Sequence, residues 1–292
     1  MNRRRFLGSA ISGALAQFCR AEPGLSVRFT RTRTRLVVVP VLVGATRLSF
    51  VLDTGSGSSI IATEAVERLA PGEFQVRGRM SVQFVGGKAQ AQWFTLPSVA
   101  VAGGEPVRLE AAGLSLASHR EELGGAVDGF LGMDVLTRYG LRFDLRGQRL
   151  DLLPSEAQLM PDDSVEFELD RERKILFPAQ VQGRSVTALL DTAAARSVVN
   201  WAASEQAGVS QSAALAERNV LVGGDGALLA THEHPFRVRA GSVSWNRPLL
   251  IVDVPAFESM GLRDKPAAML GIDLLDGHGV IITFANKRLA IY

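Results

Sequence analysis

Short apolar runs and alternating apolar and polar residues dominate the chain, and this pattern predicts many short strands. Residues 36–43 form a valine-rich run around Pro40, and a second run, 48–52, ends at Asp53. β-branched residues favour strands, whereas a proline inside such a run favours an edge strand or a bulge. Residues 80–84 alternate up to Gly86-Gly87 and the chain returns through 89–94, which predicts a hairpin. Residues 141–152 and 280–292 predict two further hairpins.

Helix signals are few, and the helices they predict are short. A helix from Thr63 to Ala70 would be stopped by Pro71-Gly72, and the spacing of Ser118 and Glu121 is that of a capping box. A third helix would end at Gly208. The candidate N-caps are Thr63, Ser118, Asp134, Asn200 and Asp273. Many strands and few helices predict an all-β protein.

The strand pattern of the first half returns in the second half, 138 positions downstream. Residues 50–61 read as an apolar strand, Asp53, Thr54, Gly55, small residues and two isoleucines, and residues 188–199 repeat this order around Asp191 and Thr192. Other landmarks recur in the same order at nearly the same spacing: Pro40 and Pro178, Val85-Gly86-Gly87 and Val222-Gly223-Gly224, Leu131-Gly132-Met133-Asp134 and Leu270-Gly271-Ile272-Asp273. Such matches indicate a duplication with small loop insertions, and hence two halves that face each other.

Each half resembles the retropepsin and pepsin group of aspartic proteases, and the resemblance runs from Leu36 to Tyr292. It implies two pseudo-twofold-related β-barrel lobes whose Asp-Thr-Gly turns meet at the lobe interface. It also implies that the glycine-tipped hairpins act as flaps over the substrate, with Gly86, Gly87, Gly223 and Gly224 at the tips. Ala193 departs from the family pattern, which has glycine there.

The predicted organisation has four parts: an export signal at 1–21, an N-terminal lobe at 22–153, a linker at 154–164 and a C-terminal lobe at 165–292. The linker carries two prolines and several acidic residues with a weak pattern.

Composition fits two soluble lobes, because 292 residues with 47% hydrophobic and 21% charged residues can bury a sizeable core. The chain has 32 basic and 30 acidic residues, and four of the arginines lie within 1–21. The remainder has a formal charge of −2 and no basic stripe with interleaved aromatic residues, so we expect no nucleic-acid partner. Four arginines between 28 and 35 alternate with threonines and predict one solvated strand edge.

The first residues predict export. Three arginines, 3–5, precede a modest apolar run, 6–16, which is followed by small residues suitable for cleavage. The order Asn2-Arg3-Arg4-Arg5-Phe6-Leu7 resembles a twin-arginine signal and predicts a periplasmic protein, although an ordinary secretory signal also has a basic start. The run is too short to be a membrane span, so none is expected in the mature form. Cys19, the single cysteine, lies in this segment, so the mature chain has no disulfide.

Two carboxylates are the candidate catalytic groups. Carboxylates placed about 3 Å apart cannot both ionise cheaply and therefore share a proton, so that one serves as base and the other as acid. Asp53 and Asp191 are the only Asp-Thr pairs at matching repeat positions. This pair needs no cofactor and no metal.

Four neighbours are candidate supports of the two acids. By resemblance, Thr54 and Thr192 hydrogen-bond to the opposite turn. Gly55 permits a positive φ and a close approach of backbone, and a positive φ at Ala193 would cost on the order of 1 kcal/mol. Ser56 could donate its hydroxyl to Asp53, whereas Ala194 at the repeat position could not. We therefore expect Asp53 to be the preferentially ionised member.

Other constellations are weak. His232 and His234 share one strand face without an evident third metal ligand, and the Gly-Gly pairs lack the Lys-Ser or Lys-Thr of a phosphate loop. The sequence does not place a histidine beside a nucleophilic serine.

These features predict an exported, monomeric aspartic endopeptidase that acts on peptide or protein substrates. One alternative is a non-catalytic peptide-binding protein in which Ala193 displaces the second acid. Another is a homodimer that pairs two copies of Asp53.

Overall fold

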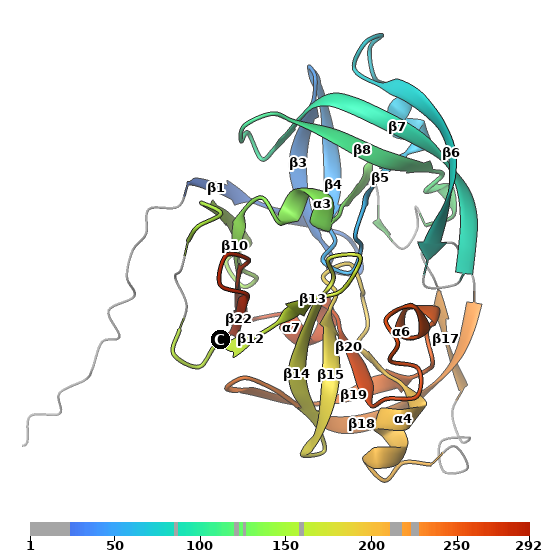
Figure 1. Cartoon of the computed structure of the whole chain (residues 1–292), viewed down its shortest axis with the longest axis vertical. Helices are drawn as coiled ribbons and strands as arrows, with labels where there is room; N and C mark the ends of the chain where they lie inside the picture. The colour runs from blue at the N-terminus through green and yellow to red at the C-terminus, as the bar shows by residue number, and fades with distance from the viewer. Residues whose placement is uncertain are drawn as a thin grey trace, which may run out of the picture.

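Six strands of the first half of the chain close into a barrel, the upper lobe in Figure 1. The computed structural model describes residues 24–84, 87–119, 123–124, 127–157, 161–210, 218–222 and 228–292. The barrel strands, in spatial order, are β3 (Val37–Val43), β4 (Thr46–Leu52), β9 (Gly129–Leu131), β5 (Ser59–Ala62), β8 (Val107–Leu114) and β7 (Gly87–Val101). Pairing of β3 with β7 closes the ring, and β2 (Thr30–Arg31) and β6 (Gln75–Phe84) extend its sheet.

The second half builds the lower lobe with the same strand order. Its barrel strands are β14 (Ile175–Val181), β15 (Arg184–Leu190), β20 (Ala267–Leu270), β16 (Val198–Val199), β19 (Val243–Ile251) and β18 (Leu228–Ala240). Pairing of β14 with β18 closes this barrel, and β13 (Glu168–Leu169) and β17 (Arg218–Val222) extend it. The prediction of an all-β protein with two related barrel lobes is confirmed, whereas the limits at 153 and 165 stay a prediction.

Pro40 lies in a strand that is paired on both sides, so the expectation of an edge or bulge was wrong. Pro40 lies opposite Ser49 of β4, and on its other side the pairing with β2 ends at Val38 before the pairing with β7 begins at Val41. Proline has no N–H to donate and therefore suits this gap between two neighbours.

A third sheet joins the lobes. Its strand order is β1 (Leu25–Arg28), β11 (Arg149–Leu153), β10 (Gly140–Asp144), β21 (Gly279–Thr283), β22 (Arg288–Ile291) and β12 (Val165–Glu166). The two predicted hairpins, β10–β11 and β21–β22, meet where β10 pairs with β21, on the left of Figure 1. Continuous hydrogen bonding through this sheet fixes the lobes relative to each other.

The helices of the described residues are short. They are α1 (Thr63–Val66), the 3₁₀ helix η1 (Ala117–His119), α3 (Met133–Leu136), α4 (Trp201–Gln206), α6 (Pro255–Ser259) and α7 (Ile272–Leu275). Asn200 caps α4 as predicted, since its Oδ1 accepts from the N–H of Ala203 at 2.9 Å, and Gly208 has φ +89° just beyond the helix end.

Several predicted caps were wrong. The N-cap of α1 is Ala62, one residue before Thr63, and the helix ends before Ala70. Asp134 lies within the first turn of α3, whose N-cap is Gly132, and Asp273 holds the same place in α7. Their carboxylates bind other residues, described below. Ser118 lies in η1, whereas Glu121, its predicted capping partner, lies outside the described residues.

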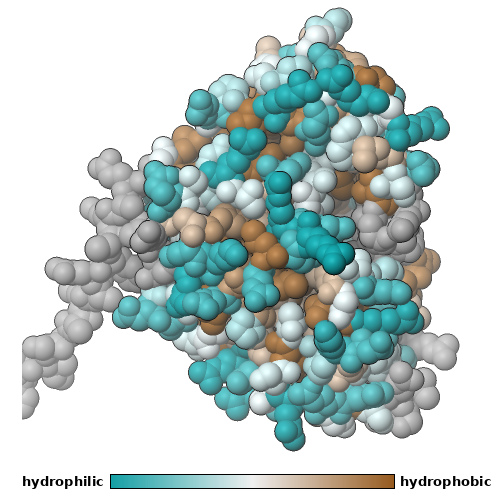
Figure 2. Space-filling model, viewed as in Figure 1, coloured by the Kyte–Doolittle hydropathy of each residue, from teal (hydrophilic) through white to brown (hydrophobic). Residues whose placement is uncertain are grey.

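The apolar residues of the strands form the core, and its largest fully buried side chains include Phe50, Phe177 and Phe236 of the barrels and Phe143 of the joining sheet. On the face in Figure 2, hydrophobic residues form small areas separated by hydrophilic ones. Among the described residues, no helix is both long and apolar enough to cross a membrane.

Candidate active site

The two candidate acids come directly after equivalent buried strands, β4 and β15. The N–H of Asp53 donates to the carbonyl of Leu131 at 2.9 Å, and the N–H of Asp191 donates to that of Leu270 at 3.0 Å. Each acceptor ends a strand, β9 or β20, that runs parallel to the strand before the acid. The last three residues of each strand before the acid are buried, and the strands end where the lobes meet.

Thr54 and Thr192 lock the two turns together across the interface. Thr54 Oγ1 donates to the carbonyl of Leu190 at 2.8 Å, and Thr192 Oγ1 donates to that of Leu52 at 2.7 Å. Each hydroxyl also accepts from the opposite backbone, from Thr54 N at 3.2 Å and from Thr192 N at 3.1 Å. The threonines are 0% and 2% exposed, so this ring of four hydrogen bonds is shielded from water.

The ring brings Asp53 and Asp191 together within one chain. A Cβ atom at Gly55 would lie 2.3 Å from Cγ of Asp191, so the first turn touches the second acid. The N–H of Gly55 donates to Asp53 Oδ1 at 2.9 Å, and the N–H of Ala193 donates to Asp191 Oδ1 at the same distance. Ala193 therefore holds its acid as Gly55 does. Neither residue has a positive φ, so the expected strain at Ala193 is absent.

Burial raises the pKa of both carboxyl groups, since Asp53 is 9% exposed and Asp191 is 8% exposed. The charge of Asp191 raises the pKa of Asp53 further. Backbone hydrogen bonds oppose the rise in pKa, from Gly55 and Ser56 to Asp53 and from the corresponding alanines to Asp191. A coupled pair in such a site holds one proton over a range of pH in which a lone carboxyl would hold none.

Ser56 does not have the predicted role. Its hydroxyl donates to the carbonyl of Ser58 at 2.8 Å, and only its backbone N–H acts on Asp53. Ala194 supplies the equivalent backbone bond to Asp191, at 3.0 Å. The reason for expecting Asp53 to be the preferentially ionised member therefore falls away, because the two acids have matching backbone donors.

A serine and an aspartate in each half, which were not predicted as site residues from the sequence, support each Asp turn. Ser59 Oγ donates to Asp134 at 2.7 Å and accepts from the N–H of Gly132 at 3.0 Å. Ser197 repeats this with Asp273 at 2.6 Å and with the N–H of Gly271 at 2.9 Å. Both serines are six positions after an acid, and this repeated position was the available signal.

A cleft between the lobes contains both acids. Its walls carry apolar residues at matching repeat positions of the two halves, namely Ile60 and Val198, Leu116 and Val254, and Phe130 and Met269. The hairpins β6–β7 and β17–β18 lie on the same side in Figure 1 and contribute Val82 and Leu221. Of the predicted flap glycines, Gly87 begins β7, whereas Gly86, Gly223 and Gly224 lie outside the described residues.

The two histidines of β18 lie in aromatic contacts. The ring of His232 is 5.5 Å from that of Trp201, and the ring of His234 is 5.0 Å from that of Phe236. Within the described part of the chain, no group of three or more metal-ligating side chains gathers in one place.

The comparisons agree with this geometry. The model of the aspartyl protease family matches residues 39–135, which begin in β3 and end in α3 and so include the Asp53 turn. No curated protein matches the chain. The match lies within the first lobe, and the second half repeats the barrel of that lobe. The fold is consistent with two retropepsin-like lobes.

Proposed function

We propose that the protein is an exported aspartic endopeptidase that hydrolyses peptide bonds with water activated between Asp53 and Asp191. The observation that carries this proposal is the buried threonine ring, which holds two carboxyl groups of raised pKa against each other at the base of the cleft. The family match and the fold support a protease, and the assignment of these residues is our inference from the geometry.

The proposed reaction uses the singly ionised pair. The ionised carboxylate takes a proton from water as the water oxygen bonds to the carbonyl carbon, and the protonated carboxyl gives its proton to the carbonyl oxygen. The carboxyl that took the water proton then gives it to the amide nitrogen, and the other carboxylate takes a proton from a hydroxyl of the tetrahedral intermediate, so that the carbonyl re-forms as the C–N bond breaks. The threonine ring and the backbone donors position both carboxyl groups before substrate binds, which is how a rigid site lowers the barrier.

The cleft favours an extended peptide with apolar side chains on both sides of the scissile bond. The matching apolar pairs, such as Ile60 with Val198 and Phe130 with Met269, present similar surfaces on the two sides of the acids. Burial of an apolar side chain in each surface would stabilise the bound peptide. Peptide or protein is thus the proposed substrate class.

The structure bears on both alternatives. Ala193 keeps the backbone bond to Asp191, which argues against a displaced second acid. The place opposite Asp53 is filled by the Asp191 turn of the same chain, so the pair needs no second copy. A monomer is therefore the form that we propose, and solution mass by sedimentation tests it.

The decisive experiment is digestion of a mixed peptide library over a range of pH. We expect the mature wild type to cleave, and Asp53→Asn and Asp191→Asn each to lose activity by about 10³-fold or more, because each removes the acid or the base. Asp162→Asn, at an exposed position, is the matched control. Circular dichroism checks that the variants fold. Substantial activity of Asp191→Asn would exclude the intramolecular pair, and an inactive wild type would favour the non-catalytic alternative.

Export is a separate proposal, which rests on residues 1–21. If the twin-arginine route is used, Arg3→Lys with Arg4→Lys should leave precursor in the cytoplasm, whereas a general secretory signal would tolerate lysines. Cell fractionation with an antibody measures this. Normal periplasmic accumulation of the double variant would assign the protein to the general route.

A further inference from the structure

The cleft is symmetric in its apolar residues but not in its charges. Leu36 of the first lobe lines the cleft and is 4% exposed. Its counterpart 138 positions later is Lys174, which also lines the cleft and is 6% exposed. Lysine is rarely buried to this extent without a role or a partner. One lobe thus presents an ammonium group where the other presents an isobutyl group.

A tight turn holds Lys174 in place. Asp170 Oδ1 accepts from the N–H groups of Glu172 and Lys174, both at 2.8 Å, and the turn leads into β14. Lys174 Nζ lies 2.5 Å from Glu172 Oε2. The lysine head group therefore has a defined position on the cleft wall.

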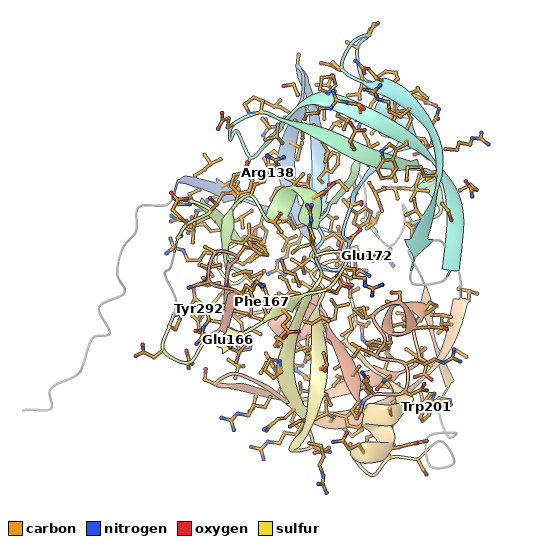
Figure 3. All side chains as sticks on the ribbon, in the orientation of Figure 1. Arg138, Glu166, Phe167, Glu172, Trp201 and Tyr292 are labelled. Carbon is orange, nitrogen blue, oxygen red and sulfur yellow. The ribbon has the colours of Figure 1, made fainter. Side chains whose placement is uncertain are left out.

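The same turn reaches across to the first lobe. A Cβ atom at Gly57 would lie 2.3 Å from the carbonyl oxygen of Glu172, so the turn rests on the loop that follows Asp53. Figure 3 labels Glu172 between the two lobes. Lys174 consequently belongs to the second lobe but lies beside the turns of both acids.

The charge of Lys174 acts on both carboxyl groups. It lowers the pKa of Asp53 and of Asp191, against the larger effect of burial, which raises both. An interaction with a fixed charge inside a poorly hydrated cleft is screened less than one at the surface.

The other charged or titratable groups of the cleft are Glu172, Arg196 and His119. Arg196 is directed elsewhere, because it pairs with Glu233 and its Nε lies 3.9 Å from Asp273. Arg173, in the same turn, acts on Asp134 of α3 and lowers its pKa, although burial has the larger effect and raises it. The carboxylate of Asp170 accepts hydrogen bonds from backbone N–H groups of the turn.

We propose that Lys174 is a positioning residue of the dyad, whose ammonium group keeps the Asp53–Asp191 pair singly ionised to a lower pH than a symmetric cleft with leucine would. This inference rests on the proposed function, since the singly ionised pair is the active form. A cation near the pair favours each loss of a proton, so it moves both limbs of the pH–activity profile to lower pH.

The test compares Lys174→Met with wild type on a library peptide that wild type cleaves. Both limbs of the kcat/KM profile should move to higher pH, by on the order of half a pH unit. Lys174→Arg keeps the charge and should keep the profile. Leu36→Met, at the counterpart position, is the control for packing and should also leave both limbs in place. The comparison is repeated with His119→Asn in both backgrounds, because His119 also lines the cleft.

A second variant covers the case in which Lys174→Met does not fold. Glu172→Gln leaves the ammonium group without its carboxylate, so both limbs should move to lower pH. Unchanged limbs in both variants would overturn the inference, as would an equal shift in Leu36→Met or Lys174→Arg.

A measurement that needs no activity separates this inference from the proposed function. The carboxyl carbons of the two acids, labelled with ¹³C-aspartate and assigned with the Asp→Asn variants, are titrated by NMR. Their midpoints should rise in Lys174→Met whether or not the protein cleaves peptides. If wild type cleaves no peptide but the midpoints rise in Lys174→Met, only the proposed protease function is wrong. If wild type is active but the midpoints do not move in Lys174→Met, only the role of Lys174 is wrong.

Discussion

At the scale of single residues, the two sides of the dyad differ in how tightly they are packed. A side chain at Gly55 would meet Asp191 at 2.3 Å, whereas Ala193 carries its methyl group at the repeat position with the backbone bond to Asp191 intact. Because neither residue has a positive φ, glycine is needed at position 55 for contact and not for backbone conformation.

This difference predicts that substitutions at Gly55 and at Ala193 have unequal effects. Gly55→Ala should lower the free energy of unfolding by about 1–3 kcal/mol, as overpacking does, and should reduce kcat/KM by displacing Asp191. Ala193→Gly should leave kcat/KM close to that of wild type. Urea denaturation and peptide cleavage measure the two quantities. Equal effects of both exchanges would show that the two sides are packed alike.

The sequence predicted the residues of this site better than their contacts. The resemblance to aspartic proteases implied that Thr54 and Thr192 hydrogen-bond across the interface, as they do. It could not predict that the Ser56 hydroxyl turns to Ser58, because the direction of a hydroxyl depends on the folded loop around it. A lysine next to a strand is usually solvent-exposed, so the sequence did not predict the burial of Lys174.

At the scale of elements, the two Asp turns form one hydrogen-bonded unit, and each threonine hydroxyl takes part in two of its four bonds. Removal of one hydroxyl leaves a buried N–H group and a buried carbonyl without partners. Each buried group left without a partner typically lowers the free energy of unfolding by about 1–3 kcal/mol.

A double-mutant cycle tests this unit. Thr54→Val and Thr192→Val should each destabilise the protein by about 2 kcal/mol or more, and the double variant by less than the sum, because either change already breaks the ring. Thr137→Val is the matched control, since its hydroxyl donates within α3, to Met133, away from the interface. Strict additivity in denaturant titrations would mean that the four bonds act independently.

The pairing of strands that are far apart in the sequence could not be predicted from the local pattern of apolar and polar residues. The hairpins β10–β11 and β21–β22 were predictable from alternation, but their joining through β10 and β21 was not. These strands lie more than 130 residues apart in the chain, and the pattern of one hairpin does not predict that it pairs with the other. The same limit explains Pro40, whose place between two pairings depends on strands far along the sequence.

At the scale of the whole molecule, the fold places two acids where water is scarce and holds them there through both barrels and the shared sheet. This arrangement lowers stability at neutral pH, because a buried carboxylate pair favours bound protons that the unfolded chain would release. The pKa of Asp53 and of Asp191 is raised in the folded state, chiefly by burial.

The sign of the resulting pH dependence is fixed. A raised folded-state pKa adds stability below the ordinary carboxyl pKa of about 4, and this contribution is lost as pH rises through the folded-state values. We therefore expect Asp53→Asn with Asp191→Asn to gain stability relative to wild type as pH increases above about 4. Asp134, whose pKa burial also raises, and Asp151, whose pKa is lowered by hydrogen bonds to arginines, are present in both proteins, so their effects cancel in the difference. Thermal unfolding followed by circular dichroism from acid to neutral pH measures this difference. A difference that stays constant with pH would mean that the two acids titrate in the folded protein as they do in the unfolded chain, and that the cleft does not hold a shared proton.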